Sequence, residues 1–216
     1  MPAFSTLSTP DLFTAATRLY TGVRDTPGVL DALAPYDYGR DDVTDGLDLI
    51  TALRTTIGQQ ATEDAEQRTA TAAASAAADA VRRAYARHRT LARRKHPRGT
   101  PGYSALALAG DIPGGDSDML ADADRFYATL EGAPDLAAPI RNLPASAIDA
   151  AQAAIVAASA ADATQTRETG EAQRATVARQ AAERVLRAEA AELAEAARLA
   201  LEDQPQLREA LGLLER

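Results

Sequence analysis

The chain has 216 residues, a formal net charge of −8, 46% hydrophobic residues and no cysteine. This length and apolar content can build a buried core, which excludes an intrinsically disordered chain. The missing cysteine excludes disulfides, thiolate metal sites and a cysteine nucleophile, and the acidic balance argues against a chain-wide affinity for nucleic acid.

The residue types favour helices throughout the chain. Alanine, the strongest helix former, accounts for 52 residues, and β-branched and aromatic residues never alternate with a period of two. We therefore expect an all-α fold. The first twenty residues lack the pattern of a signal peptide, and no apolar run is long enough to cross a membrane. With the absence of cysteine, these features predict a cytoplasmic protein without a membrane span.

The first predicted element is a short amphipathic helix that begins near Ser8. The Ser8 hydroxyl is a suitable cap, and Pro10 lies in the first turn. A turn containing Pro27 leads to a second short helix over 29–33, and Pro35 ends it. The apolar residues of the first helix recur at helical spacing and form one face. They are Leu12, Ala15, Ala16, Leu19, Tyr20 and Val23.

A long segment without proline follows, over residues 41–96. Large apolar residues at helical spacing form a seam that begins at Val43. In the middle of the segment the seam positions are alanines, and large residues return at Val81 and Tyr85. Two interpretations remain open: one continuous helix, or a hairpin that turns near the polar middle. The continuous helix is favoured, because Gly58 is the only helix breaker near the middle of the segment and a hairpin loop needs a stronger turn signal.

The second half of the chain repeats this layout. Asp124-Arg125-Phe126-Tyr127 corresponds to Thr17-Arg18-Leu19-Tyr20 at an offset of 107, and Gln173-Arg174 corresponds to Gln67-Arg68 at an offset of 106. These anchors keep their order and predict a tandem duplication. The second copy is expected to have its own short helices around 119–130 and 136–140, and a long proline-free segment over 145–203.

The duplication defines the expected architecture. Residues 1–110 form the first helical repeat unit, 111–116 a linker, and 117–216 the second repeat unit, together making one integrated domain. We expect long antiparallel helices in an elongated, coiled-coil-like bundle, with short helices capping them.

The strongest charge feature is a basic run without any acidic residue. As a contact for an anion or a partner, it would bind phosphate groups or an acidic protein. In the alternative interpretation, its charges are balanced by acidic residues of neighbouring helices, for which Asp41, Asp42, Asp45 and Asp48 are available. The basic residues are Arg82, Arg83, Arg87, Arg89, Arg93, Arg94, Lys95 and Arg98.

Two recurring pairs lie in the middle of the long segments. Gln67, Arg68, Gln173 and Arg174 would form a buried polar layer that fixes helix register, if the segments pack antiparallel. The alternative is that all four are exposed residues of the helix surface.

Tyr20 and Tyr127 recur within Arg-x-Tyr, and we interpret them as core residues whose hydroxyls reach a partner at the edge. His88 falls on the apolar seam, as expected of a buried histidine with a satisfied ring, and His96 lies at a helix C-terminus, which favours a cation. Neither histidine has the carboxylate spacing of a di-metal bundle.

The sequence also lacks Gly-x-Ser-x-Gly and a glycine-rich phosphate loop. We therefore expect no catalytic residue, no metal, no cofactor and no enzymatic activity. A catalytic carboxylate pair would need a cleft that only the three-dimensional structure reveals.

The residues 197–207, followed by Glu209-Ala210-Leu211-Gly212, resemble the end of a family of bacterial all-helical two-repeat proteins with no assigned activity. Arg125-Phe126-Tyr127 is similar to the same family. The resemblance implies the helical two-repeat architecture and no catalytic residue.

The expected function is that of a non-enzymatic scaffold or protein-interaction protein, binding a protein partner or a second copy of itself. The alternative is a module that binds anionic polymers or surfaces through the basic segment Arg82–Arg98, although nucleic acid is disfavoured by the scarcity of aromatic stacking partners.

Overall fold

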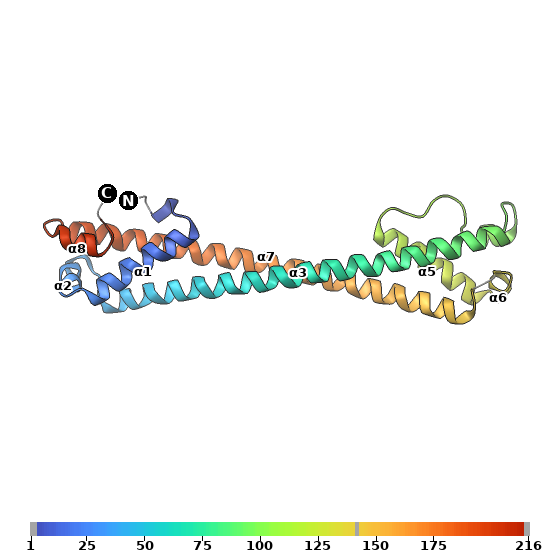
Figure 1. Cartoon of the computed structure of the whole chain (residues 1–216), viewed down its shortest axis with the longest axis horizontal. Coiled ribbons are helices and arrows are strands. Elements are labelled where there is room, and N and C mark those ends of the chain that lie inside the picture. The colour runs from blue at the N-terminus through green and yellow to red at the C-terminus, as the bar shows by residue number, and fades with distance from the viewer. Residues whose placement is uncertain (1–3, 141–142, 214–216) are drawn as a thin grey trace. The chain divides into compact units, whose positions relative to one another are not determined.

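The structure is a computed structural model that describes residues 4–140 and 143–213. All regular elements in these residues are helices, as the composition predicts (Figure 1). In chain order they are η1 (Phe4–Thr6), α1 (Thr9–Asp25), α2 (Val29–Leu33), η2 (Ala34–Tyr36), α3 (Arg40–Lys95), α4 (Pro101–Ala105), α5 (Asp116–Gly132), α6 (Pro134–Ala137), α7 (Ala145–Ala200) and α8 (Pro205–Ala210).

The short helices begin where the sequence predicts. The Ser8 hydroxyl accepts a hydrogen bond from the Asp11 amide at 3.4 Å, and Pro10 occupies the first turn of α1. Gly28, in the left-handed conformation with φ 79°, reverses the chain between α1 and α2. A residue with a Cβ is strained at that angle, so glycine is required there.

The long helices α3 and α7 each run without interruption for 56 residues. The continuous-helix interpretation is confirmed and the hairpin interpretation is wrong. Gly58 lies on the surface of α3, where an isolated glycine lowers helix stability without ending the helix.

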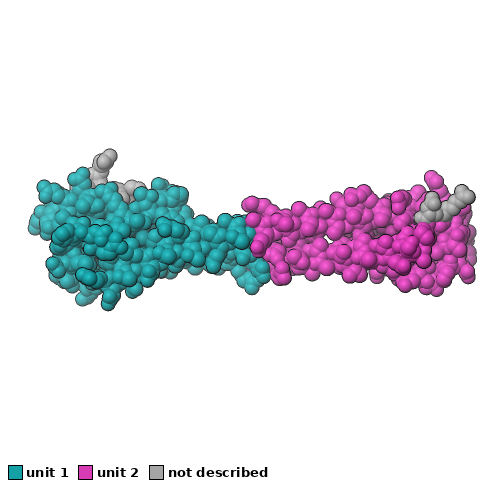
Figure 2. Space-filling model, turned by 60° about the horizontal axis from the view of Figure 1, so that its bottom comes forward, with its two compact units in different colours: residues 1–64, 171–216 teal, residues 65–170 magenta. Residues whose placement is uncertain are grey.

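Contacts divide the chain into two compact units (Figure 2). Unit 1 comprises residues 1–64 and 171–216, and unit 2 comprises residues 65–170. Each unit combines one end of α3 with the opposite end of α7. The division predicted at 111–116 follows the sequence repeat and stays a prediction. Residues 1–3, 141–142 and 214–216 of the predicted repeat units lie outside the described residues.

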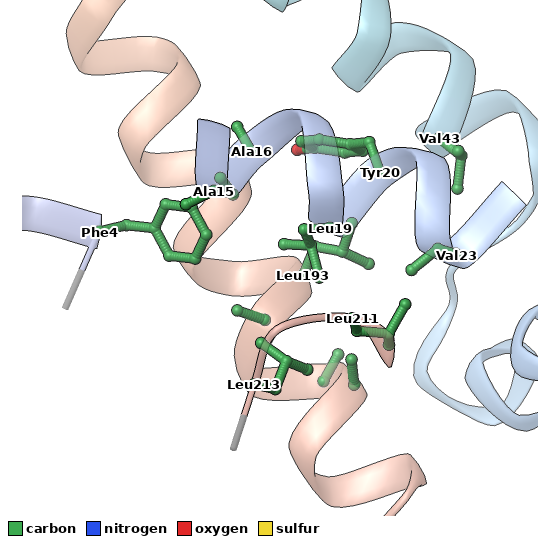
Figure 3. Close-up of a cluster of buried hydrophobic side chains, with 14 of the residues drawn as sticks. Phe4, Ala15, Ala16, Leu19, Tyr20, Val23, Val43, Leu193, Leu211 and Leu213 are labelled. Carbon is green, nitrogen blue, oxygen red and sulfur yellow. The ribbon is translucent and has the colours of Figure 1, made fainter. Parts of the chain in front are cut away.

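In unit 1, α1 packs its apolar face against α3 and α7. Figure 3 shows Leu19, Tyr20 and Val23 of α1 together with Val43 of α3 and Leu193 of α7. Gln60 donates from its side-chain amide to the Thr176 hydroxyl at 3.3 Å. This pairs the later part of the α3 segment with the earlier part of the α7 segment, so the two run antiparallel.

In unit 2, α5 packs its apolar face against the opposite ends of the same two helices. Its core contains an aromatic cluster in which Phe126 and Tyr127 of α5 meet Tyr85 of α3 edge to face, with ring centroids 5.1–6.3 Å apart. Edge-to-face contacts add to the burial energy of such rings. Both units are therefore small helical bundles with separate cores.

The order of the α-helices and the lengths of the longer ones recur along the chain. α1 and α5 each have 17 residues, and α3 and α7 begin and end at an offset of 105. Residues of α3 and α7 related by this offset are called equivalent below. A tandem duplication would leave this pattern, and the duplication itself stays a prediction.

Candidate functional site

The basic segment of unit 2 separates into two groups of side chains. One group turns toward the loop between α4 and α5, residues 106–115, and the other is exposed. The loop-facing residues are Arg82, Arg89 and Arg93, of which Arg93 is also exposed. The exposed Arg83, Arg87, Arg94, Lys95 and Arg98 donate no hydrogen bond to the described loop.

Arg89 is the centre of the first group. Only 3% of this residue is exposed, and its guanidinium donates to the carbonyls of Ala107, Ala109 and Gly110 at 3.2, 2.8 and 3.3 Å. Arg93 donates to the Leu108 carbonyl at 3.0 Å and also to Gly110. The planar guanidinium carries five N–H donors, which suits it to several carbonyls at once.

Arg82 binds the later part of the same loop. It donates to the Pro113 and Gly114 carbonyls at 2.7 and 3.0 Å and forms an ion pair with Asp116 at 2.7 Å. The partners of these arginines are thus main-chain carbonyls and Asp116, in place of the expected Asp41, Asp42, Asp45 and Asp48. Three of the eight predicted contact residues thereby hold a loop of their own unit.

Arg187, the equivalent of Arg82, also donates hydrogen bonds to main-chain carbonyls, in unit 1. It donates to the Phe4 and Leu7 carbonyls at 2.6 and 2.7 Å and pairs with Glu183. Arg82 therefore fastens the segment that precedes α5, and Arg187 fastens the segment that precedes α1. The sequence analysis missed Arg187, although its spacing from Arg82 matches that of the helices.

His88 and Tyr127 form a buried polar contact in unit 2. The His88 ring is 4% exposed, and its Nδ1 lies 2.9 Å from the Tyr127 hydroxyl. Burial, followed by the nearby Arg87 charge, lowers the pKa of His88 below its usual 6.5. The neighbouring Tyr85 hydroxyl donates to Asp122 at 2.6 Å, and burial, with this hydrogen bond, raises the pKa of Tyr85. His96 is also buried, and its Nε2 lies 2.9 Å from the Leu136 carbonyl oxygen.

The lowered pKa of His88 makes the chain less stable in mild acid. Below pH 6.5 His88 is protonated in the unfolded state but stays neutral in the folded state. We therefore expect the free energy of unfolding to fall as the pH drops from 6.5 toward the lowered pKa. His88→Leu, which introduces the residue found at the equivalent Leu193, removes this dependence. Urea titrations at several pH values above 5 measure it, and an unchanged slope in the variant would contradict the assignment.

Unit 1 contains an acidic pocket between α3 and α7. Its volume is about 520 Å³, and its wall includes Asp42, Asp45, Asp48 and Glu189 but no basic residue. Tyr20 reaches it from α1 and is only 2% exposed. Burial, and next the Glu189 charge, raise the pKa of Tyr20, so its hydroxyl stays neutral.

The hydroxyl of Tyr20 lacks the partner that the sequence analysis expected. Among the described residues it has no hydrogen bond, whereas Tyr127 has His88. The equivalent of His88 is Leu193, which offers no polar atom. Gly46 lets the Tyr20 ring lie against α3, because a Cβ at that position would overlap the ring.

The predicted buried polar layer is not present. Arg68, Gln173 and Arg174 are exposed, and Gln67 is half-buried. Alanines occupy the buried positions beside them, among them Ala70 and Ala172. The long arginine side chains lie where their charges stay hydrated, because burying a charge without a partner costs several kcal/mol.

One face of α7 in unit 1 carries exposed apolar side chains. Val177, Val185 and Leu199 are 62%, 47% and 55% exposed. At 100° per residue they fall within an arc of about 80° around the helix, which also carries the exposed Glu192 and Glu195. The equivalent positions of α3 are Ala72, Ala80 and Arg94, all exposed and none a large apolar residue.

None of the described helices is long and apolar enough to cross a membrane. Comparisons with protein-family models, curated proteins and solved structures found no match. The resemblance of residues 197–212 to a helical two-repeat family therefore stays a prediction.

Proposed function

We propose that this chain is a non-enzymatic protein-interaction protein that binds a partner helix along the face of α7 that carries Val177, Val185 and Leu199 in unit 1. The exposed apolar arc of Val177, Val185 and Leu199 supports this proposal. Scattered apolar residues are normal on a surface, but a set aligned on one helix face suits contact with another helix. A cytoplasmic location, favoured by the cysteine-free composition, is part of the proposal.

The arc can be tested by photo-crosslinking in cells. With benzophenone-alanine at position 199, we expect one adduct of defined mass, and a doubled mass identifies a second copy of the chain as the partner. Val177→Glu in the same chain should reduce the adduct at least fivefold, because a carboxylate in an apolar contact loses hydration. Ala72→Glu, the equivalent change in α3, is the matched control and should leave the adduct unchanged. An equal yield of the adduct in Val177→Glu and Ala72→Glu would contradict the proposal.

A second candidate function is binding of an anionic polymer or surface through the basic segment. Arg83, Arg87 and Arg94 support it, because they lie on one exposed face of α3 at spacings of four and seven residues. Placing the crosslinker at position 94 distinguishes the two candidates, since this position is equivalent to 199. An adduct from position 94 alone favours the basic segment.

A further inference from the structure

The acidic pocket of unit 1 has the chemistry of a binding site for an organic cation. Unit 1 contains 19 acidic and 11 basic residues, whereas unit 2 contains 12 of each, so unit 1 carries the whole net charge of the chain. The pocket concentrates this charge, because four of its lining residues are acidic and none is basic. Such a pocket raises the local concentration of cations.

Three of its carboxylates are available to a ligand. Asp42 is partly occupied, because it accepts a hydrogen bond from the Gly39 amide at 2.7 Å. Within the described part of the chain, Asp45, Asp48 and Glu189 have no ion pair or hydrogen bond.

The arrangement of these carboxylates disfavours a metal ion. No three carboxylates of the pocket, all of which the structure describes, offer oxygen atoms within 4.8 Å of one another. A divalent cation requires its oxygen ligands to converge on one point. Asp45 and Asp48 are instead separated by about 4.5 Å along the helix axis. Spaced negative charges suit a ligand with spaced positive charges.

Tyr20 is the independent observation that points to a ligand. Its side chain is almost fully buried and lines the pocket, yet its hydroxyl has no partner among the described residues. The hydroxyl oxygen itself is accessible from the pocket, so an ammonium group bound there can donate a hydrogen bond to it. Tyr127 shows the contrast, since His88 already satisfies its hydroxyl. The hydroxyl that is satisfied internally in unit 2 is thus left open in unit 1.

We propose that this pocket binds an aliphatic diammonium or polyammonium compound. Asp45, Asp48 and Glu189 neutralise its separated charges, and the Tyr20 hydroxyl accepts a hydrogen bond from one ammonium group. Tyr38 and Leu49, which also line the pocket, cover the methylene groups between the charges. This site is independent of the partner-binding face proposed for α7, apart from Val185, which borders both.

Isothermal titration calorimetry of the full chain with 1,4-diaminobutane tests this site. We expect one bound molecule per chain, and weaker binding of butylamine, which has one charge. Asp45→Asn with Glu189→Gln should weaken binding about tenfold or more, because charge-assisted hydrogen bonds are lost. Tyr20→Phe keeps the ring and should weaken binding about threefold. Circular dichroism verifies that each variant is folded.

The matched control is Asp79→Asn with Asp162→Asn, which removes two charges from unit 2 and should leave binding unchanged. Equal weakening by both double variants would show non-specific attraction and overturn the proposal. Absence of diamine binding, or displacement of the diamine by equimolar Mg²⁺, would also overturn it. Binding of a lysine-containing peptide but not of the diamine would reject the small-molecule ligand. Because Val177 and Leu199 are not altered, the result is separable from that of the crosslinking experiment.

Discussion

Arg89→Ala is expected to lower the free energy of unfolding by about 4 kcal/mol. Arg89 is 3% exposed and satisfies three carbonyls of the loop between α4 and α5. Its removal leaves these oxygens with one donor fewer and opens a cavity beside the Tyr85 ring, over which the guanidinium lies at 5.9 Å. Arg89→Lys should recover little, because an ammonium group cannot reproduce the planar fork of donors.

Urea denaturation followed by circular dichroism measures this loss. Arg83→Ala is the matched control, since Arg83 is an exposed arginine on the same helix and its loss should change stability by less than about 0.5 kcal/mol. Limited proteolysis should also cleave Arg89→Ala within residues 106–115 before it cleaves the helices. If Arg89→Ala costs no more than Arg83→Ala, the loop does not depend on this arginine.

Gly46→Ala is expected to lower the free energy of unfolding by about 3 kcal/mol. A Cβ at position 46 would overlap the ring of Tyr20, which is 2% exposed and surrounded by the unit 1 core. Three ring atoms of Tyr20 would lie 1.9–2.4 Å from the new Cβ, so the ring must leave its position or the helix must shift. Displacing Tyr20 should weaken binding of 1,4-diaminobutane as well.

Gly58→Ala, in the same helix, is the control, and it should change the free energy of unfolding in the opposite direction. Nothing lies within 4 Å of a Cβ at Gly58, so alanine should stabilise the helix by about 0.5–1 kcal/mol. Thermal denaturation of the two variants compares them directly. A stabilised Gly46→Ala variant would mean that the Tyr20 ring does not lie against α3 in solution.

The helices were predictable because their signals are local. The cap at Ser8, the proline at position 10 and the apolar spacing from Leu12 to Val23 act within a few residues of one another. For the same reason, the absence of a turn signal around Gly58 was enough to favour a continuous α3. These features depend on neighbouring residues and on no distant contact.

The candidate sites were less predictable because their partners are distant in sequence. Arg89 and Arg83 belong to one basic run, yet Arg89 is buried under a loop and Arg83 is in solvent. Charge composition does not distinguish them, because the difference depends on which helix face meets residues 107–110. Similarly, nothing local marks Gly46 as the glycine that a tyrosine from α1 covers.

The sequence by itself determined the all-α class, the two long helices and their short companions, because helix propensity, capping and periodicity act over short distances. The tertiary structure alone decided which of two similar tyrosines has a partner. Tyr127 meets His88, whereas Tyr20 meets an acidic pocket and Leu193 takes the position equivalent to the histidine. This difference arises where helices from distant parts of the chain pack together, and burial there fixes which polar groups are satisfied.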